Sequence, residues 1–362
     1  MNKKEKNQKI HELCCWADKL SEEYSITFIT SHREKTRNTN DYNTFSVKSE
    51  FYSDELQKLI VNAFYDCGFS VNEFYNEEDF IHYIQSPNSQ EHFNTLVINS
   101  AQKGTSIGRK SLIPAFCDLY GLHYIGSNPY IVSLCRDKFR CGNILKENGI
   151  KTPHSWMYSP QYGWINGKPD MTCGRLLIKP NYESSSIGVD QNCIGEFTTA
   201  FENKIYEYAK IFRQDVLVTQ FISGYEVETP VICTKSPFSL VPVGIEKEGK
   251  KMIGDYILDY NTRSENQYDF YNFEEWNEAL SEKLIETALK TVSLLNIQGF
   301  GRVDFRIDEY GEYYVTDVST NPHYTKSSSY FFAFKEMGFS YLDMIKCLIA
   351  SKYGRSELCL RK

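Results

Sequence analysis

Hydrophobic and polar residues follow one pattern in the first third of the chain and another beyond residue 150. In the first third, residues 10–20 and 56–64 carry apolar side chains at helical spacing. Between and after them, residues 25–30 and 94–100 form short apolar runs that predict buried strands. Strands that alternate with helices in this way indicate a parallel, Rossmann-like sheet.

Strand patterns dominate the rest of the chain, which indicates antiparallel sheets. We expect one long helix from about residue 127 that ends near Asn148-Gly149, followed by Pro153. Strands are predicted at 175–180, 216–222, 226–233 and 239–246, and helices at 274–295 and 339–354. The change of pattern predicts an N-terminal domain over residues 1–125, a central subdomain over 126–215 and a C-terminal subdomain over 216–362.

Charge and composition exclude several classes of protein. The 362 residues carry a formal net charge of −7 and no long basic run, which argues against nucleic acid or an anionic membrane as a partner. The N-terminus has no apolar signal segment, and no run reaches the roughly 18 apolar residues of a membrane span. Scattered cysteines without a metal-binding spacing favour buried thiols, so we expect a cytoplasmic protein.

Two alternating runs on either side of Tyr310-Gly311 predict a β-hairpin that carries acidic residues. If Tyr310-Gly311 forms a two-residue turn, Asp304 lies directly opposite Asp317, with Cβ atoms roughly 4.5–5.5 Å apart. Positions 313, 315, 317 and 319 are then expected to share one face. A slip of one residue in register would separate the two acids onto opposite faces.

Two opposed carboxylates are destabilising unless a cation lies between them. Carboxylates without histidine or cysteine suit Mg²⁺, which binds proteins through one or two carboxylates together with phosphate oxygens. The hairpin therefore predicts a magnesium–nucleotide site. The alternative is a solvated hairpin in which arginines pair with the acids.

Segments before the hairpin could bind the rest of a nucleotide. Lys138 lies on a predicted helix and Lys179 at the end of a strand, and the small residues at 184–188 could hold phosphate oxygens. The strand 216–222 and the following Glu226 could contact adenine and ribose. Taken singly, each segment is equally consistent with an ordinary turn or strand.

In their order along the chain, these segments resemble the ATP-grasp superfamily, and within it the D-alanine–D-alanine ligase branch. The resemblance rests on "GSNPYIVSLCRDK", "IKPNYESSSIGVD", "ISGYEVE", "GRVDFRID" and "DVSTNP", and it extends from about Val97 to Lys346. It implies an α/β ATP-grasp fold, in which a Rossmann-like N-terminal domain precedes central and C-terminal α+β subdomains that hold ATP between antiparallel sheets.

The resemblance also implies roles for individual residues. ATP would be bound by Lys138, Lys179, Ser185, Ser186, Gly188, Thr219, Gln220, Ile222 and Glu226. Mg²⁺ would be held by Asp304, Asp317 and Ser319. Arg302, Arg263 and His323 would take part in catalysis.

The chain departs from the family pattern at several of these positions. Ser319 replaces an asparagine that binds metal, so one or two Mg²⁺ ions remain open. Arg263 stands where the family has a lysine, and His323 stands where it has a glycine. His323 is either a proton acceptor in an altered acceptor pocket or a packed side chain. The family's glutamate for the first substrate corresponds to Glu34 or Glu50.

The resemblance therefore implies an ATP-dependent carboxylate–amine ligase that forms a peptide or amide bond through an acyl phosphate and releases ADP and phosphate. Its substrates would be amino acids, peptides or related small molecules, and by analogy it could form a homodimer. The alternatives are a D-alanine–D-alanine ligase proper and an ATP-binding regulatory module without catalysis.

Overall fold

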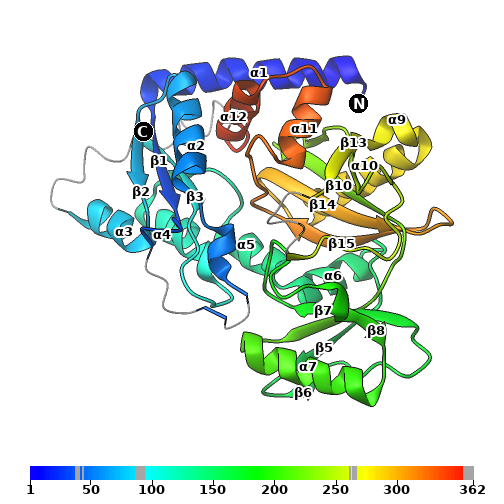
Figure 1. Ribbon diagram of the computed structural model, residues 1–362. Coiled ribbons are helices and arrows are strands. Elements are labelled where there is room, and N and C mark those ends of the chain that lie inside the picture. Colours follow the sequence, from blue (N-terminus) through cyan, green and yellow to red (C-terminus); the bar gives the residue numbers. More distant parts are fainter. Residues whose placement is uncertain (37–40, 43–44, 87–93, 261, 263–266, 354–362) are drawn as a thin grey trace.

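Three β-sheets form the framework of the protein (Figure 1). The computed structural model describes residues 1–36, 41–42, 45–86, 94–260, 262 and 267–353. Among the helices of these residues, none is long and apolar enough to cross a membrane.

The first sheet is parallel, with the strand order β2-β1-β3-β4. Its strands are β1 (Ser25–Thr30), β2 (Val71–Phe74), β3 (Thr95–Ser100) and β4 (His123–Tyr124). The helices between them are α2 (Asp54–Asp66), α3 (Glu77–Gln85) and α4 (Leu112–Tyr120), and two short 3₁₀ turns, η1 (Val47–Glu50) and η3 (Arg109–Ser111), follow β1 and β3. The parallel, Rossmann-like sheet is thus as predicted, and its carboxyl edge carries η1 and η3.

The second sheet is antiparallel, with the order β6-β5-β9-β7-β8. Its strands are β5 (Ser155–Ser159), β6 (Gly163–Trp164), β7 (Arg175–Pro180), β8 (Ile194–Glu196) and β9 (Val216–Gln220). A 3₁₀ turn, η4 (Gln191–Cys193), precedes β8, and α7 (Thr199–Phe212) packs on the sheet. This sheet lies at the bottom of Figure 1.

The third sheet has six strands in the order β13-β12-β10-β14-β15, with β11 paired to β10. Its strands are β10 (Tyr225–Cys233), β11 (Phe238–Ser239), β12 (Val243–Glu246), β13 (Asp269–Asn272), β14 (Gly299–Ile307) and β15 (Tyr313–Ser319). The helices beside it are α9 (Phe273–Trp276), α10 (Glu278–Leu294), α11 (Ser329–Glu336) and α12 (Tyr341–Ala350). Because α10 covers one face of this sheet, the polar side chains of β14 are left on the other face.

The prediction of one long helix between residues 127 and 148 is wrong, because the structure has two helices there. They are α5 (Pro129–Arg136) and α6 (Lys138–Glu147). Asp137 interrupts the helix because its side chain caps α6 at Arg140 N and also accepts a hydrogen bond of 2.8 Å from Asn181 Nδ2. Lys138 is therefore the first residue of α6. A similar break at Asn277, which caps α10, divides the helix predicted at 274–295.

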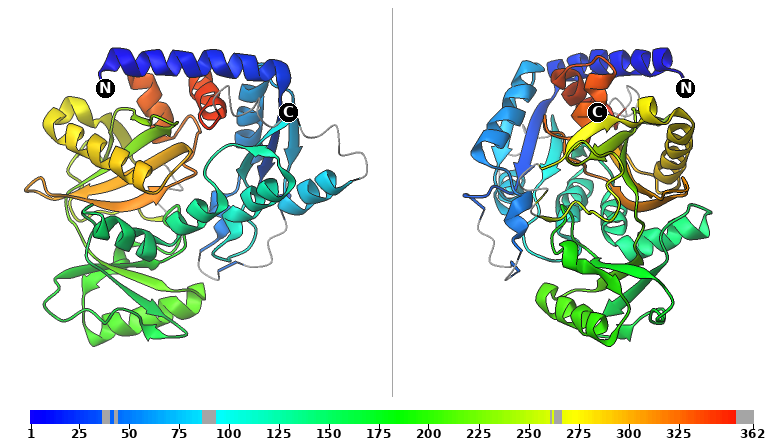
Figure 2. Two further views of the ribbon diagram at one scale, coloured as in Figure 1. Left: turned by 180° about the vertical axis from the view of Figure 1, so that it is seen from behind. Right: turned by 45° about the vertical axis from the view of Figure 1, so that its right-hand side comes forward.

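The first helix, α1 (Lys3–Glu23), ties the N-terminal sheet to the end of the described chain. It crosses over α11 and α12 in each view of Figures 1 and 2. Ile10 is fully buried in the same core cluster as Met344 of α12, and Trp16 Nε1 donates a 2.8 Å hydrogen bond to Tyr353 O. The division of the chain at residues 125 and 215 stays a prediction, although β9 is seen to pair within the second sheet.

Replacing Ile10 by alanine tests how much α1 stabilises this arrangement. We expect Ile10→Ala to lower the free energy of unfolding by about 2–5 kcal/mol, because it removes buried methyl groups and leaves a cavity against α12. Urea denaturation followed by circular dichroism measures the loss. Gln8→Ala, on the exposed face of the same helix, should change the free energy by less than about 0.5 kcal/mol.

Candidate active site

A single continuous cavity lies between the three sheets and gathers most of the residues predicted from the sequence. Its walls include Lys138, Lys179, Ser185, Ser186, Thr219, Gln220, Ile222, Glu226, Arg302, Asp304, Asp317, Ser319 and His323. Gly188 lies behind this wall, and Arg263 lies outside the described residues.

The hairpin of β14 and β15 places the two acids opposite each other, but by another route than predicted. Asp304 pairs with Asp317, as expected. The turn is not the two-residue Tyr310-Gly311 turn, because the strands end at Ile307 and Tyr313 and enclose five residues, 308–312. An extra residue at Thr316, between the partners of Asp304 and Phe305, forms a β-bulge that restores the register.

Because of the bulge, the side chains of β15 do not share a face in the way that was predicted. Val315 pairs with Phe305 and packs with Val318 in the hydrophobic core, so it does not share the face of Asp317. Without the extra residue at Thr316, the register of the turn would point Asp317 away from Asp304. The acid pair therefore depends on a single local irregularity.

Basic side chains surround the acid pair. Arg302 contacts Asp304 with two hydrogen bonds of 2.7 Å, and Lys138 Nζ lies 3.5 Å from Asp317 Oδ1. Burial raises the pKa of Asp304 against the attraction of Arg302, and the charge of Asp317 adds to this shift. Burial opposes the ionisation of Asp317 too, but Lys138 and Lys179 outweigh it and lower its pKa.

The alternative interpretation of the hairpin is partly correct, since an arginine does pair with one of the two acids. The acid pair is nevertheless not solvated, because the side chains of Asp304 and Asp317 are mostly buried in the cavity. Arg302 has a second carboxylate partner, Glu228, at 3.0 Å. It can therefore keep an ion pair if Asp304 turns to a metal ion.

The small-residue loop after β7 forms a tight turn over the cavity. Ser185 and Ser186 both have positive φ angles, of 53° and 57°, a conformation that is uncommon for residues other than glycine and is concentrated at ligand-binding sites. Gly188 has a φ of 77°, and a Cβ atom there would lie 2.6 Å from Phe212 and from Pro180. Gly188 thus supports the loop from behind through close packing.

One end of the cavity is apolar, and several of its residues were not predicted. They are Leu145, Pro153, Leu177, Leu217 and Val315. Thr219, Gln220 and Ile222 lie beside them on and just after β9, so backbone groups and apolar side chains meet there. A flat heterocycle such as adenine suits this combination. The apolar residues give no distinctive signal in the sequence because they follow the ordinary strand and helix patterns of the core.

The other end of the cavity is polar, and the two candidate glutamates differ in their position relative to it. Glu50 is buried and lines the cavity, whereas Glu34 is exposed and lies outside it. His323 lies on the wall next to the buried Tyr324. Lys326, another possible substrate contact, is exposed, and its Nζ lies 5.3 Å from the ring centre of Tyr341.

Comparison with known proteins identifies the family. Residues 173–350 match the family described as D-ala D-ala ligase C-terminus. The D-alanine–D-alanine ligase of Carboxydothermus hydrogenoformans is 32% identical over 260 residues, which cover 69% of this chain and 80% of the relative. The chain belongs to the D-alanine–D-alanine ligase family. The ligase of Thermotoga petrophila is 25% identical over 304 residues and covers 83% of this chain and 92% of its own.

Solved structures of this family share the fold. A D-alanine–D-alanine ligase from Bacillus anthracis, complexed with ATP, superposes with a TM-score of 0.65 at 17% identity and covers 93% of this chain and 98% of its own. The ligase of Coxiella burnetii gives a TM-score of 0.65 at 15% identity and covers 93% and 97% of the two chains. The predictions of an ATP-grasp fold and of an enzyme that forms C–N bonds are confirmed.

Two glycines with similar φ angles allow the packing behind the small-residue loop to be tested. In Gly311→Ala, only the positive φ of 83° opposes the side chain, because no atom lies within 4 Å of the added Cβ, and we expect a loss of about 1–2 kcal/mol. In Gly188→Ala, the overlap with Phe212 and Pro180 should add about 1–3 kcal/mol. Chemical denaturation of both variants measures the difference; equal losses would show that the contact behind the loop is readily relieved.

Proposed function

We propose that the protein is an ATP-dependent carboxylate–amine ligase that joins two small molecules through an amide bond and releases ADP and phosphate. The observation that carries this proposal is the position of the acid pair. Asp304 and Asp317 face a cavity that also holds Lys138, Lys179 and Arg302, and whose far end is apolar. Such a cavity offers separate places for metal, phosphates and a purine.

The acid pair fits Mg²⁺ by the nature of its donor atoms. Both side chains offer carboxylate oxygens, which Mg²⁺ prefers, and their mutual repulsion calls for a cation. Mg²⁺ bound there would neutralise phosphate oxygens and stabilise the charge that develops on them. Ser319 lies opposite Arg302 on the same wall and offers a hydroxyl oxygen as a further ligand.

The reaction would proceed in two steps. A carboxylate oxygen of the first substrate attacks the γ-phosphorus of ATP, the bond from that phosphorus to the bridging oxygen breaks, and ADP leaves. The amine nitrogen of the second substrate then attacks the acyl carbon, the bond to phosphate breaks, and the amine loses a proton. Because the acyl phosphate is sensitive to water, the buried position of the site protects it.

The residues of the cavity would support both steps. Lys138 and Lys179 would neutralise the phosphates of ATP, and the turn at Ser185 and Ser186 would cover them. Arg302, held by Glu228 at 3.0 Å, would stabilise the charge on the acyl group during phosphoryl transfer. His323, which lies on the wall, would accept a proton from the attacking amine.

The substrates are proposed to be amino acids or peptides other than two D-alanines. The segment after Pro322 supports this, because His323 and Tyr324 place an imidazole and a phenol at the polar end of the cavity. D-alanine–D-alanine ligation is the second candidate, since the relatives carry that name. By analogy with related ligases we also propose a cytoplasmic homodimer, which sedimentation velocity tests for the oligomeric state.

A screen for turnover tests the ligase function. The purified protein with ATP and Mg²⁺ should release ADP only when a suitable acid and amine are both supplied, and mass spectrometry should detect the condensed product. Omission of Mg²⁺ in the presence of a chelator should abolish the release. ADP release that is independent of any amine, or ATP binding without turnover across L- and D-amino acids and dipeptides, would contradict the proposal.

Asp304→Asn tests the metal assignment. The substitution removes a charge from the acid pair, and we expect kcat to fall at least roughly 100-fold while circular dichroism remains unchanged. Asp308→Asn is the matched control on the same hairpin. Asp308 Oδ1 accepts hydrogen bonds from Tyr310 N and Glu312 N in the turn, which an asparagine oxygen preserves, so activity should be retained. Full activity in Asp304→Asn would refute the assignment.

A further inference from the structure

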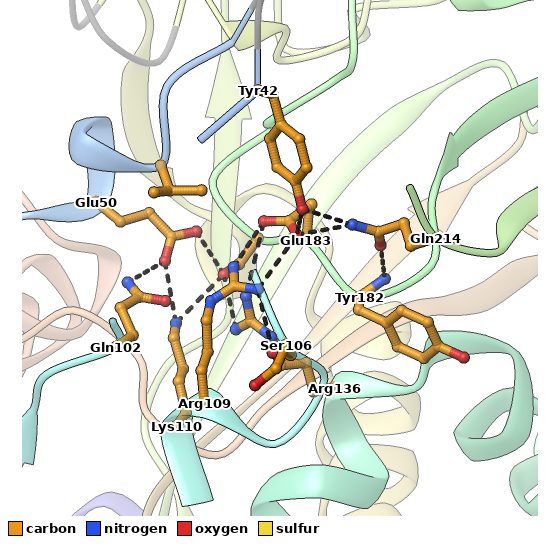
Figure 3. A network of polar contacts seen from close by, with 12 residues as sticks. Tyr42, Glu50, Gln102, Ser106, Arg109, Lys110, Arg136, Tyr182, Glu183 and Gln214 are labelled. Carbon is orange, nitrogen blue, oxygen red and sulfur yellow. Dashed lines mark hydrogen bonds and ion pairs between the residues drawn. The ribbon is translucent and has the colours of Figure 1, made fainter. Parts of the chain in front are cut away.

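A cluster of buried charges closes the polar end of the cavity. It joins η1, η3, α5 and the small-residue loop, and consists of Glu50, Arg109, Lys110, Arg136 and Glu183, here called the charged cluster. Figure 3 shows Arg109 and Lys110 extending side by side from η3 towards the two glutamates. Lys110 and Glu50 line the cavity, and Arg136 reaches the cavity wall through a 3.4 Å hydrogen bond to Ser184 Oγ.

The charged cluster has more positive than negative charge. Arg109 is neutralised by Glu183, with Nη2 and Oε2 2.7 Å apart, and Lys110 by Glu50, with Nζ and Oε2 3.1 Å apart. Arg136 is the third cation, and among the described residues the one carboxylate within ion-pair distance of it is Glu183, which lies 3.8 Å from its Nη2 and which Arg109 already holds. The cluster therefore carries one unneutralised positive charge.

The nucleotide side of the same cavity is balanced by comparison. There, four cations face four carboxylates: Lys138, Lys179, Arg302 and Arg306 against Asp304, Asp317, Glu228 and Glu226. With two Mg²⁺ ions, ATP carries no net charge, so it can be accommodated there without drawing on the charged cluster. The excess positive charge next to Lys110 is left for another anion.

Unsatisfied hydrogen-bond donors point in the same direction. The Arg136 side chain is only 6% exposed, and its Nε and Nη2 atoms have no hydrogen-bond acceptor among the described residues. Buried donors of this kind are unfavourable unless a ligand or water satisfies them. Burial also lowers the pKa of Lys110 to about 8, and the neighbouring Arg136 contributes to the shift although Glu50 opposes it. A bound anion would accept hydrogen bonds from Arg136 and would stabilise the charged form of Lys110.

Glu50 is poorly placed to attract a positively charged substrate group. One carboxylate oxygen accepts a 2.6 Å hydrogen bond from Ser184 Oγ, and the other contacts Lys110 and accepts a hydrogen bond from Gln102. Lys110, Arg136 and Arg109 hold its pKa well below the usual range despite its burial. Its negative charge is balanced by cations of the protein. An approaching ammonium group of a substrate would therefore face mainly positive charges.

We propose that the acid activated by this enzyme carries a second carboxylate, and that this group binds at the charged cluster beside Lys110. The inference rests on the proposed ligase function. Ser184, which accepts hydrogen bonds from Lys110 and Arg136, directly precedes Ser185, which is proposed to cover the phosphates. One carboxylate of a short dicarboxylic acid would therefore lie at Lys110 while the other reaches Arg302 on the wall of the same cavity. The enzyme would then prefer aspartate- or glutamate-like acids to neutral ones.

Matched pairs of acids test the inference. Aspartate and asparagine, and glutamate and glutamine, differ by one charge at nearly constant shape. With ATP, Mg²⁺ and a pool of neutral amines, we expect kcat/KM for the charged member of at least one pair, in one chirality, to exceed that for its neutral partner roughly 10- to 100-fold. Near equality within every pair, or preference for the neutral members, would overturn the inference while leaving ligase activity established.

Variants of the cluster locate the effect. Lys110→Met should reduce the preference to near equality, whereas Lys103→Met should keep it, because Lys103 lies on the same connection but outside the cavity, paired with Glu78. Glu50→Gln increases the positive charge and should retain or raise the preference. The inference would be overturned if Lys110→Met lowered kcat/KM equally for both acids of a pair, or if it raised only the KM for ATP.

A binding measurement separates this inference from the proposed function. Aspartate or glutamate should raise the melting temperature of the wild-type protein more than the matching amide does, and Lys110→Met should lose the difference. If this charge-dependent binding occurs without ADP release from any acid, the dicarboxylate site stands and the ligase function fails. If neither binding difference nor turnover is found, both are refuted.

Discussion

The repulsion between the opposed carboxylates of Asp304 and Asp317 is the constraint on which the site depends. A buried like-charged pair is unfavourable unless cations surround it. The protein provides them from three directions, with Arg302 on the same strand, Lys179 at the end of β7 and Lys138 at the start of α6. The second sheet, the third sheet and α6 must therefore meet at one point for the acid pair to be tolerated.

Elements outside the site hold the sheets in that position. The break at Asp137 lets α6 begin at Lys138, and α1 spans from the N-terminal sheet to α12 through a continuous core. The charged cluster links the N-terminal sheet directly to the loop that covers the cavity, since Arg109 and Lys110 of η3 contact Glu183 and Ser184. The same contacts therefore hold that loop in place and close the polar end of the cavity.

Sequence and structure agree best where the signal is local. The helical spacing of α1, the alternation in β14 and the order of the family motifs predicted the fold and the charged side chains around the acid pair. The charged cluster was missed because its members lie far apart in sequence. Arg109, Lys110 and Arg136 look like surface residues when read singly, and only the fold brings them together beside Glu50, with the two arginines buried and Lys110 partly so.

By itself, the sequence determined the family, most of the strand and helix pattern, and a set of lysines and acids that the structure brings together in one cavity. Tertiary structure alone decided how they meet. The correct pairing of Asp304 with Asp317 arises from a longer turn and a bulge at Thr316, which offset each other in a way that side-chain alternation does not reveal. The fold likewise decided the net charge at the polar end of the cavity, because a charged residue is neutralised only by the residues that the fold places next to it.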